Sequence, residues 1–143
     1  MRILLILLLV STKICAQDSL NVKLLFNWND TSIAQVSAYG NALFRYNEVW
    51  GVAINGREYA IIGSTEGTHI FDVTDPVNSI LVEYIPGAYS SAVHRDYHDY
   101  NGYLYMVSEE GNTTLQIADL SFLPDSAPIV YDSDTLFAST HNI

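Results

Sequence analysis

Hydrophobic and polar positions alternate in short runs along most of the chain. Two of these runs surround an Asn-Gly pair, at Asn55 and Gly56 within residues 52–61 and at Asn101 and Gly102 within residues 98–107. Asn and Gly adopt positive φ most easily, which a type I′ two-residue turn requires. The flanking positions are rich in β-branched and aromatic residues, as half-buried strands are. Each run is therefore predicted to form a β-hairpin.

The two hairpins belong to a longer repeat. Each is followed by a turn containing Gly, a strand that ends in Asp72 or Asp119, a turn containing Pro, and a further apolar run at 80–85 or 129–131. Four short strands joined by such turns are typical of one blade of a β-propeller. The sequence thus predicts an all-β fold of β-propeller-type repeats. One blade is expected at about 48–93, a second at about 94–138, and the start of a third at 139–143.

About two blades make an incomplete ring, because a closed propeller needs roughly four to eight. Two blades also leave a long unpaired strand edge, which favours aggregation. We therefore expect the chain to be a fragment or a truncated gene product. A small β domain of two sheets is the alternative.

The first 16 residues are predicted to be a secretory signal peptide. Arg2 precedes an eight-residue apolar run at 3–10 that is too short to span a bilayer, and cleavage is expected between Ala16 and Gln17. Lipidation at Cys15 is an alternative that Lys13 fits poorly. Residues 17–47 are expected to hold an N-terminal strand at 21–28 and a connector. The protein is thus expected to be secreted, either extracellular or at the cell surface.

Charge limits the partners. The formal net charge is −10, and removal of Arg2 and Lys13 with the signal peptide would make it −12. Such a chain repels phosphate backbones and anionic lipids, so we expect no nucleic-acid partner. No run after the signal peptide is apolar enough for a transmembrane span. No motif for a nucleophile or a phosphate-binding loop occurs, so no catalytic residue, cofactor or metal is predicted.

Three segments contain acidic or histidine residues that could suggest ligand sites. His94 and His98 are expected on one strand about 13 Å apart, too far for one zinc ion. The run from Asp72 to Pro76 could suggest calcium, but it lacks the ligand spacing of an EF-hand loop, and strand-ending turns explain it more simply. Glu109 and Glu110 are expected to be solvated on a tight loop.

A different group could converge at the mouth of the propeller's central channel. His94 and His141 occupy matching places in successive units, and the innermost strand of each blade lines the channel. The candidate binding residues are Trp50, Arg95, Asp96, His141 and Asn142. The alternative is that Arg95 and Asp96 only satisfy buried polar groups of neighbouring blades.

Several short motifs together resemble the N-terminal part of the choice-of-anchor B family. They are Trp50-Gly51, residues 56–60, Gly67-Thr68, residues 71–76, Arg95-Asp96, Asp119-Leu120 and residues 141–143. The strands that end near Asp72 and Asp119 resemble the LVIVD repeat of related β-propellers. The resemblance covers about residues 24–143. It implies an exported, extracellular or cell-surface β-propeller, and it implies no activity.

Two functions follow as hypotheses. The first is a non-enzymatic scaffold that binds an unknown protein or glycan. The alternative is a metal-dependent hydrolase or lactonase-like propeller that holds a cation near Asp96, His141 and Asn142.

Overall fold

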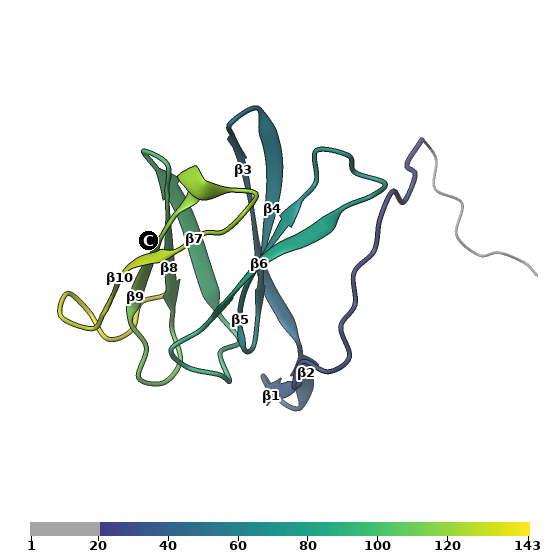
Figure 1. The fold of residues 1–143 in the computed structure, drawn as a ribbon. Helices are drawn as coiled ribbons and strands as arrows, with labels where there is room; N and C mark the ends of the chain where they lie inside the picture. Colours follow the sequence, from purple (N-terminus) through teal and green to yellow (C-terminus); the bar gives the residue numbers. More distant parts are fainter. Residues whose placement is uncertain (1–20) are drawn as a thin grey trace, which may run out of the picture.

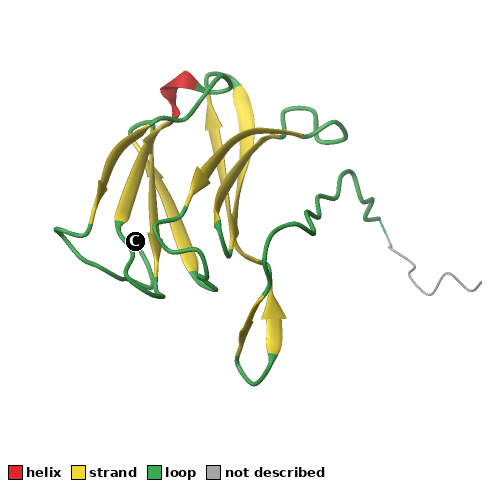
Figure 2. Ribbon diagram, turned by 60° about the horizontal axis from the view of Figure 1, so that its bottom comes forward, coloured by secondary structure: helices red, strands yellow, loops and turns green. Residues whose placement is uncertain are grey.

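The computed structural model describes residues 21–143, which form an all-β fold (Figure 1 and Figure 2). The first four-stranded antiparallel sheet contains, in order, β3 (Tyr46–Ile54), β4 (Arg57–Ser64), β5 (Gly67–Asp72) and β6 (Ile80–Pro86). The second contains β7 (Arg95–Tyr100), β8 (Tyr103–Ser108), β9 (Leu115–Asp119) and β10 (Ile129–Ser133). A 3₁₀ turn, η1 (Leu120–Phe122), follows β9, and β1 (Val36–Ala38) and β2 (Ala42–Phe44) form a separate hairpin. The predicted signal peptide lies outside the described residues.

Both Asn-Gly pairs form the predicted turns. All four residues have positive φ: 53° and 74° at Asn55 and Gly56, and 51° and 81° at Asn101 and Gly102. The strands pair directly up to each turn, with Ile54 opposite Arg57 and Tyr100 opposite Tyr103. A two-residue loop with positive φ at both positions follows the right-handed twist of its strands. The two hairpin predictions are confirmed.

The two sheets are equivalent in connection and lie next to each other. In each sheet the chain passes through four neighbouring strands in sequence order, and the Asn-Gly hairpin joins the first two. The first strands, β3 and β7, contact each other, and Figure 1 shows the two sheets side by side. The repeat in the sequence therefore corresponds to two neighbouring antiparallel sheets.

One hydrophobic core lies between the facing sides of the sheets. The first sheet contributes Tyr59, Ile61 and Ile70, and the second contributes Tyr97, Leu104 and Met106. All six side chains are at least 97% buried. Burial of one such side chain stabilises a fold by about 1.5–3 kcal/mol. Alternation along each strand places these residues on one face, so the packing of the two sheets follows directly from the period-two pattern.

Asp72 and Asp119 end the third strand of their sheets in the same way. The Asp72 carboxylate accepts a hydrogen bond from the Thr74 backbone N–H at 3.0 Å, and that of Asp119 accepts one from Ser121 at 2.9 Å. Short polar side chains commonly turn the backbone by this contact two residues on. The turn interpretation of the segment after Asp72 agrees with this geometry.

The predicted N-terminal strand at residues 21–28 is wrong, because this segment runs irregularly without strand pairing. Trp28 packs instead on Tyr46, His69 and Phe71 of the first sheet, with ring centroids 4.8–5.0 Å apart. The packing of the Trp28 ring, instead of strand pairing, thus attaches this segment to the first sheet. The connector after it contains the β1–β2 hairpin, and β3 already begins at Tyr46.

Residues 139–143, predicted to start a further unit, form no strand. They lie along the second sheet, where Thr140 N–H donates to the Ser108 carbonyl at 3.2 Å and Ile143 N–H donates to the Asp96 carboxylate at 2.7 Å. These contacts place His141 near the end of β8.

Candidate functional site

The hydrogen bonds of the residues predicted at the channel mouth go to separate partners. The Trp50 indole N–H donates to Asp99 at 2.9 Å, and the Asp96 carboxylate accepts from Ile143 N–H. His141 turns to Glu109, while the backbone carbonyl of Asn142 accepts a hydrogen bond from Thr140. The cation site suggested near Asp96, His141 and Asn142 therefore has no common centre in these contacts.

Arg95 is a structural residue. Its guanidinium donates to the backbone carbonyls of Ser64 at 2.8 Å, Tyr89 at 2.9 Å and Thr65 at 3.3 Å. The residue is 93% buried, and this burial lowers the pKa of its guanidinium. Its donors satisfy carbonyls at the end of β4, in the β4–β5 turn and in the loop between β6 and β7. The alternative interpretation, in which Arg95 serves buried polar groups, therefore describes its place here.

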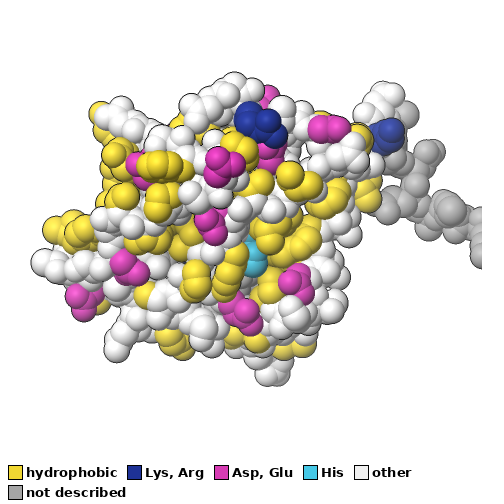
Figure 3. All heavy atoms as spheres, viewed as in Figure 1, with side chains coloured by type: hydrophobic (Ala, Val, Ile, Leu, Met, Phe, Trp, Pro, Cys, Tyr) yellow, Lys and Arg dark blue, Asp and Glu magenta, His cyan; other side chains and the backbone are white. Residues whose placement is uncertain are grey.

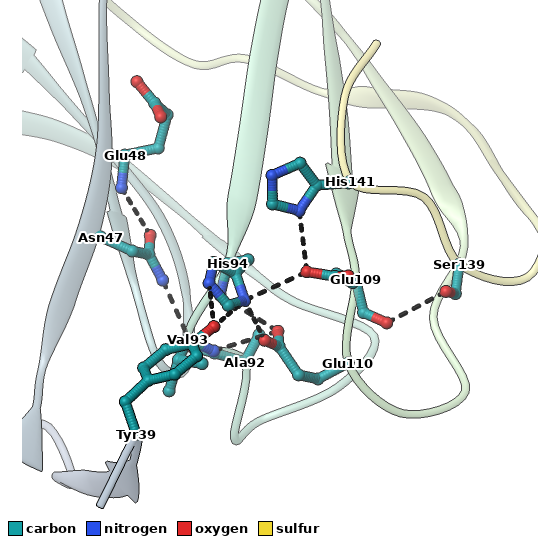
Figure 4. A network of polar contacts seen from close by, with 10 residues as sticks. All are labelled: Tyr39, Asn47, Glu48, Ala92, Val93, His94, Glu109, Glu110, Ser139 and His141. Atoms are coloured by element: carbon teal, nitrogen blue, oxygen red, sulfur yellow. Dashed lines mark hydrogen bonds and ion pairs between the residues drawn. The ribbon is translucent and has the colours of Figure 1, made fainter. Parts of the chain in front are cut away.

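A second group of polar side chains does converge, at the end of the second sheet where β7 begins (Figure 4). His94 immediately precedes β7, Glu109 and Glu110 follow β8, His141 belongs to the segment after β10, and Tyr39 lies at the tip of the β1–β2 hairpin. Four separate parts of the chain therefore meet at this point. We call His94, Glu109, Glu110 and His141 the His-Glu cluster.

Backbone N–H groups hold Glu110 in place. One carboxylate oxygen, Oε2, accepts hydrogen bonds from Val93 N–H at 3.1 Å and His94 N–H at 3.0 Å. The other oxygen, Oε1, contacts His94 Nδ1. The side chain of Glu110 is 27% exposed, so the expectation that it is merely solvated is wrong. The sequence could not indicate this, because the partners lie 16 and 17 positions earlier.

Both ring nitrogens of His94 have polar neighbours. Nε2 lies 2.6 Å from the Tyr39 hydroxyl, and Nδ1 lies 3.2 Å from Glu109 Oε2 as well as against Glu110. The same Glu109 oxygen lies 2.8 Å from His141 Nδ1. The two imidazole rings are 5.4 Å apart between centroids. Residues at matching places of successive units are thus neighbours.

The ligand atoms of His94, Glu109 and Glu110 lie within 4.8 Å of one another, which is close enough to hold one metal ion. Among residues 21–143, no other group of three or more histidine, cysteine or acidic side chains is close enough to hold one metal ion. His98, by contrast, packs against the Trp50 ring with centroids 5.3 Å apart. The two histidines of the His-x-x-x-His motif therefore have different neighbours.

One concave surface borders this region, and a larger one lies on the outer face of the first sheet. A pocket of about 330 Å³ lies between the β1–β2 hairpin and the start of β7 and is lined by Tyr39, Phe44, Tyr46, Asn47, Glu48, Val93, His94 and Arg95. A larger, mostly apolar hollow of about 890 Å³ lies between residues 22–28 and the outer face of the first sheet. Tyr39 was not a sequence candidate, since a lone tyrosine in a polar connector carries no recognisable signal.

The calcium hypothesis at Asp72 is not supported by its surroundings. The carboxylate is 96% buried and bound by the Arg57 guanidinium and by Thr74. Burial opposes ionisation of Asp72, but the hydrogen bonds from Thr74 and Arg57 outweigh it and hold the pKa of the carboxyl below its ordinary value. These contacts occupy the oxygens that a cation would need.

Comparisons with known proteins add no relative. No protein family, curated protein or solved structure matches the chain. Over residues 21–143, no helix has the length and apolar character needed to cross a membrane.

Proposed function

We propose that the chain is an exported β-propeller-type module, similar to the choice-of-anchor B family, that acts as a non-enzymatic scaffold and binds a glycan or protein partner outside the cell. The repeated sheets support the propeller interpretation. Blades of a propeller are four-stranded sheets arranged around a centre. The contact between β3 and β7, the first strands of the two sheets, is what such a radial arrangement requires.

The pocket beside the β1–β2 hairpin carries the binding proposal. Aromatic rings of Tyr39, Phe44 and Tyr46 line it together with the polar side chains of Asn47 and Glu48. A small concave surface with aromatic walls and a few polar groups is typical of a ligand site. Sugars present both an apolar ring face and several hydroxyls, so this mixture favours a glycan over a protein surface.

Charge narrows the glycan class. The chain carries 16 acidic and 6 basic residues, and Figure 3 shows acidic side chains scattered among hydrophobic ones over one face. An acidic surface disfavours the approach of anionic ligands such as sulfated or sialylated glycans. We therefore expect a neutral glycan.

A glycan array with the purified chain tests this proposal. We expect binding to one class of neutral glycans, and Tyr39→Ala, which removes an aromatic wall, should weaken it by about tenfold, the equivalent of about 1.4 kcal/mol. Tyr100→Ala is the matched control, because Tyr100 is similarly exposed (63% against 69%) but lies at the opposite end of β7.

Cross-linking of the chain to intact cells forms the second arm. If a surface protein is captured, and its capture depends on Tyr39 but not on Tyr100, the proposed scaffold role would stand and the partner would be a protein instead of a glycan. Binding that is insensitive to Tyr39→Ala in both arms would refute the proposed site.

A further inference from the structure

We propose that the His-Glu cluster binds one divalent transition-metal cation, with His94, Glu109, Glu110 and His141 as its ligands. Zn²⁺ is the natural probe for such a site. The inference goes beyond the glycan proposal, because it concerns the side of His94 that faces Glu109 and Glu110, although His94 and Tyr39 also line the glycan pocket.

Distances between the ligand atoms of His94, Glu109 and Glu110 fit a common centre. In a tetrahedral zinc site with bonds of about 2.0–2.1 Å to nitrogen and oxygen, neighbouring ligand atoms lie about 3.3 Å apart. Here Glu109 Oε2 lies 3.2 Å from His94 Nδ1 and 2.8 Å from His141 Nδ1. Glu110 Oε1 contacts the same nitrogen of His94. One imidazole nitrogen and two carboxylate oxygens are therefore grouped as three ligands would be. The exposed His141 ring contacts Glu109 and would move closer to the other two residues to become the fourth ligand.

Polar contacts with neighbouring groups orient the ligand side chains. The Tyr39 hydroxyl lies 2.6 Å from His94 Nε2, so the proton of a neutral ring can reside on Nε2 while Nδ1 stays available to a cation. The backbone N–H groups of Val93 and His94 hold one oxygen of Glu110 and leave the other directed at the centre. Metal-binding histidines and carboxylates are commonly held by such second contacts.

The donor set selects the class of metal. Calcium and magnesium prefer all-oxygen surroundings, whereas imidazole nitrogens suit zinc, nickel, copper and iron. The two glutamate carboxylates supply negative charge that a divalent cation neutralises. Arg95, which directly follows His94, does not neutralise the two glutamates, because its guanidinium donates to the carbonyls of Ser64, Thr65 and Tyr89.

The ligands would tie three segments together. His94 lies before β7, the glutamates follow β8, and His141 belongs to residues 139–143, which have no strand pairing of their own. A cation bound only by the folded arrangement stabilises it by mass action. Bound metal should therefore raise the melting temperature of the protein and protect residues 139–143 from hydrogen exchange.

Calorimetric titration of the chelator-treated, purified chain with ZnCl₂ tests the site. We expect one Zn²⁺ per chain and no comparable binding of Ca²⁺. His94→Ala and His141→Ala should each weaken the affinity by more than about 10-fold, and Tyr39→Phe, which removes only an outer contact, by about 10-fold. His141 is 61% exposed, so its replacement leaves the fold intact.

His98→Ala is the control, since His98 lies four positions from His94 but contacts Trp50 rather than the cluster. Circular dichroism without metal checks that each variant is folded. Absence of stoichiometric Zn²⁺ binding, or equal affinities of His94→Ala and His98→Ala, would overturn the proposal. An affinity unchanged by His141→Ala would overturn the four-ligand centre.

Discussion

The indole N–H of Trp50 donates a 2.9 Å hydrogen bond to the carboxylate of Asp99, which lies 49 positions later in the chain. Trp50 belongs to β3 and Asp99 to β7, so the bond joins the first strands of the two sheets. The Trp50 ring also packs on His98 of β7. One tryptophan thus links the two repeats by both a polar and an aromatic contact.

Replacement of this tryptophan should loosen the contact between the sheets. Trp50→Phe keeps an aromatic ring but removes the N–H, and hydrogen bonds to charged groups contribute about 1.5–3 kcal/mol when buried. Because Asp99 is only partly buried, we expect a loss of about 1 kcal/mol in urea unfolding. Val49→Ala, at an exposed neighbour on the same strand, should stay within about 0.5 kcal/mol. Equal losses in both variants would show that the hydrogen bond does not stabilise the fold.

The glycines of the two hairpins should be intolerant of a side chain. Gly56 and Gly102 have φ of 74° and 81°, and an L-residue pays about 1–2 kcal/mol in the left-handed region. Gly56→Ala and Gly102→Ala should therefore each lower the free energy of unfolding by about 1 kcal/mol. Gly51→Ala is the control, since a Cβ there also meets open space but φ is not positive. A loss at Gly51 as large as at the turns would contradict this explanation.

Arg95 should be important for stability. Arg95→Met keeps much of the side-chain volume but leaves the carbonyls of Ser64, Thr65 and Tyr89 without this donor. Unsatisfied buried polar groups cost about 1–3 kcal/mol each, so we expect a loss of about 3 kcal/mol in urea unfolding. Lys23→Met, at an exposed position, should change stability by less than about 0.5 kcal/mol. A near-neutral Arg95→Met would indicate that water replaces the guanidinium.

Stability should fall at alkaline pH because of Tyr97. Burial raises the pKa of this phenol to about 12, although a hydrogen bond with Thr68 and the charge of Arg95 partly oppose the shift. The buried neutral phenol contributes fully to the free energy of unfolding below the unfolded pKa of about 10. This contribution is lost as the pH rises through the folded pKa of about 12. The free energy of unfolding should therefore decrease by about 1.4 kcal/mol per pH unit between about 10 and 12.

Urea unfolding at pH 9, 10 and 11 measures this dependence. Tyr97→Phe removes the ionisable group, so the difference in slope between it and the parent isolates Tyr97 from other buried tyrosines. Parallel pH profiles for the two proteins would show that Tyr97 does not titrate on unfolding.

The repeat of hairpins was predictable because it rests on local rules. Asn-Gly requires positive φ wherever it stands between two strands, and alternating residues define a buried face without knowledge of the partner sheet. The strands ending at Asp72 and Asp119 and the fourth strands of both units follow in the same way. The irregular course of residues 21–28 was not predictable, because Trp28 is held by side chains of β3 and β5 rather than by its own pattern.

The sequence by itself therefore determined the class of fold, the turns and the spacing of the two sheets, all of which depend on backbone conformation and on neighbours within a few positions. Only the tertiary structure decided which polar side chains meet. Tyr39 and His94 are 55 positions apart, and His141 reaches Glu109 across 32. Such contacts depend on how sheets and loops pack in space, and no local periodicity encodes them. The same packing turned Arg95 inward to backbone carbonyls and gathered the His-Glu cluster at the end of the second sheet where β7 begins.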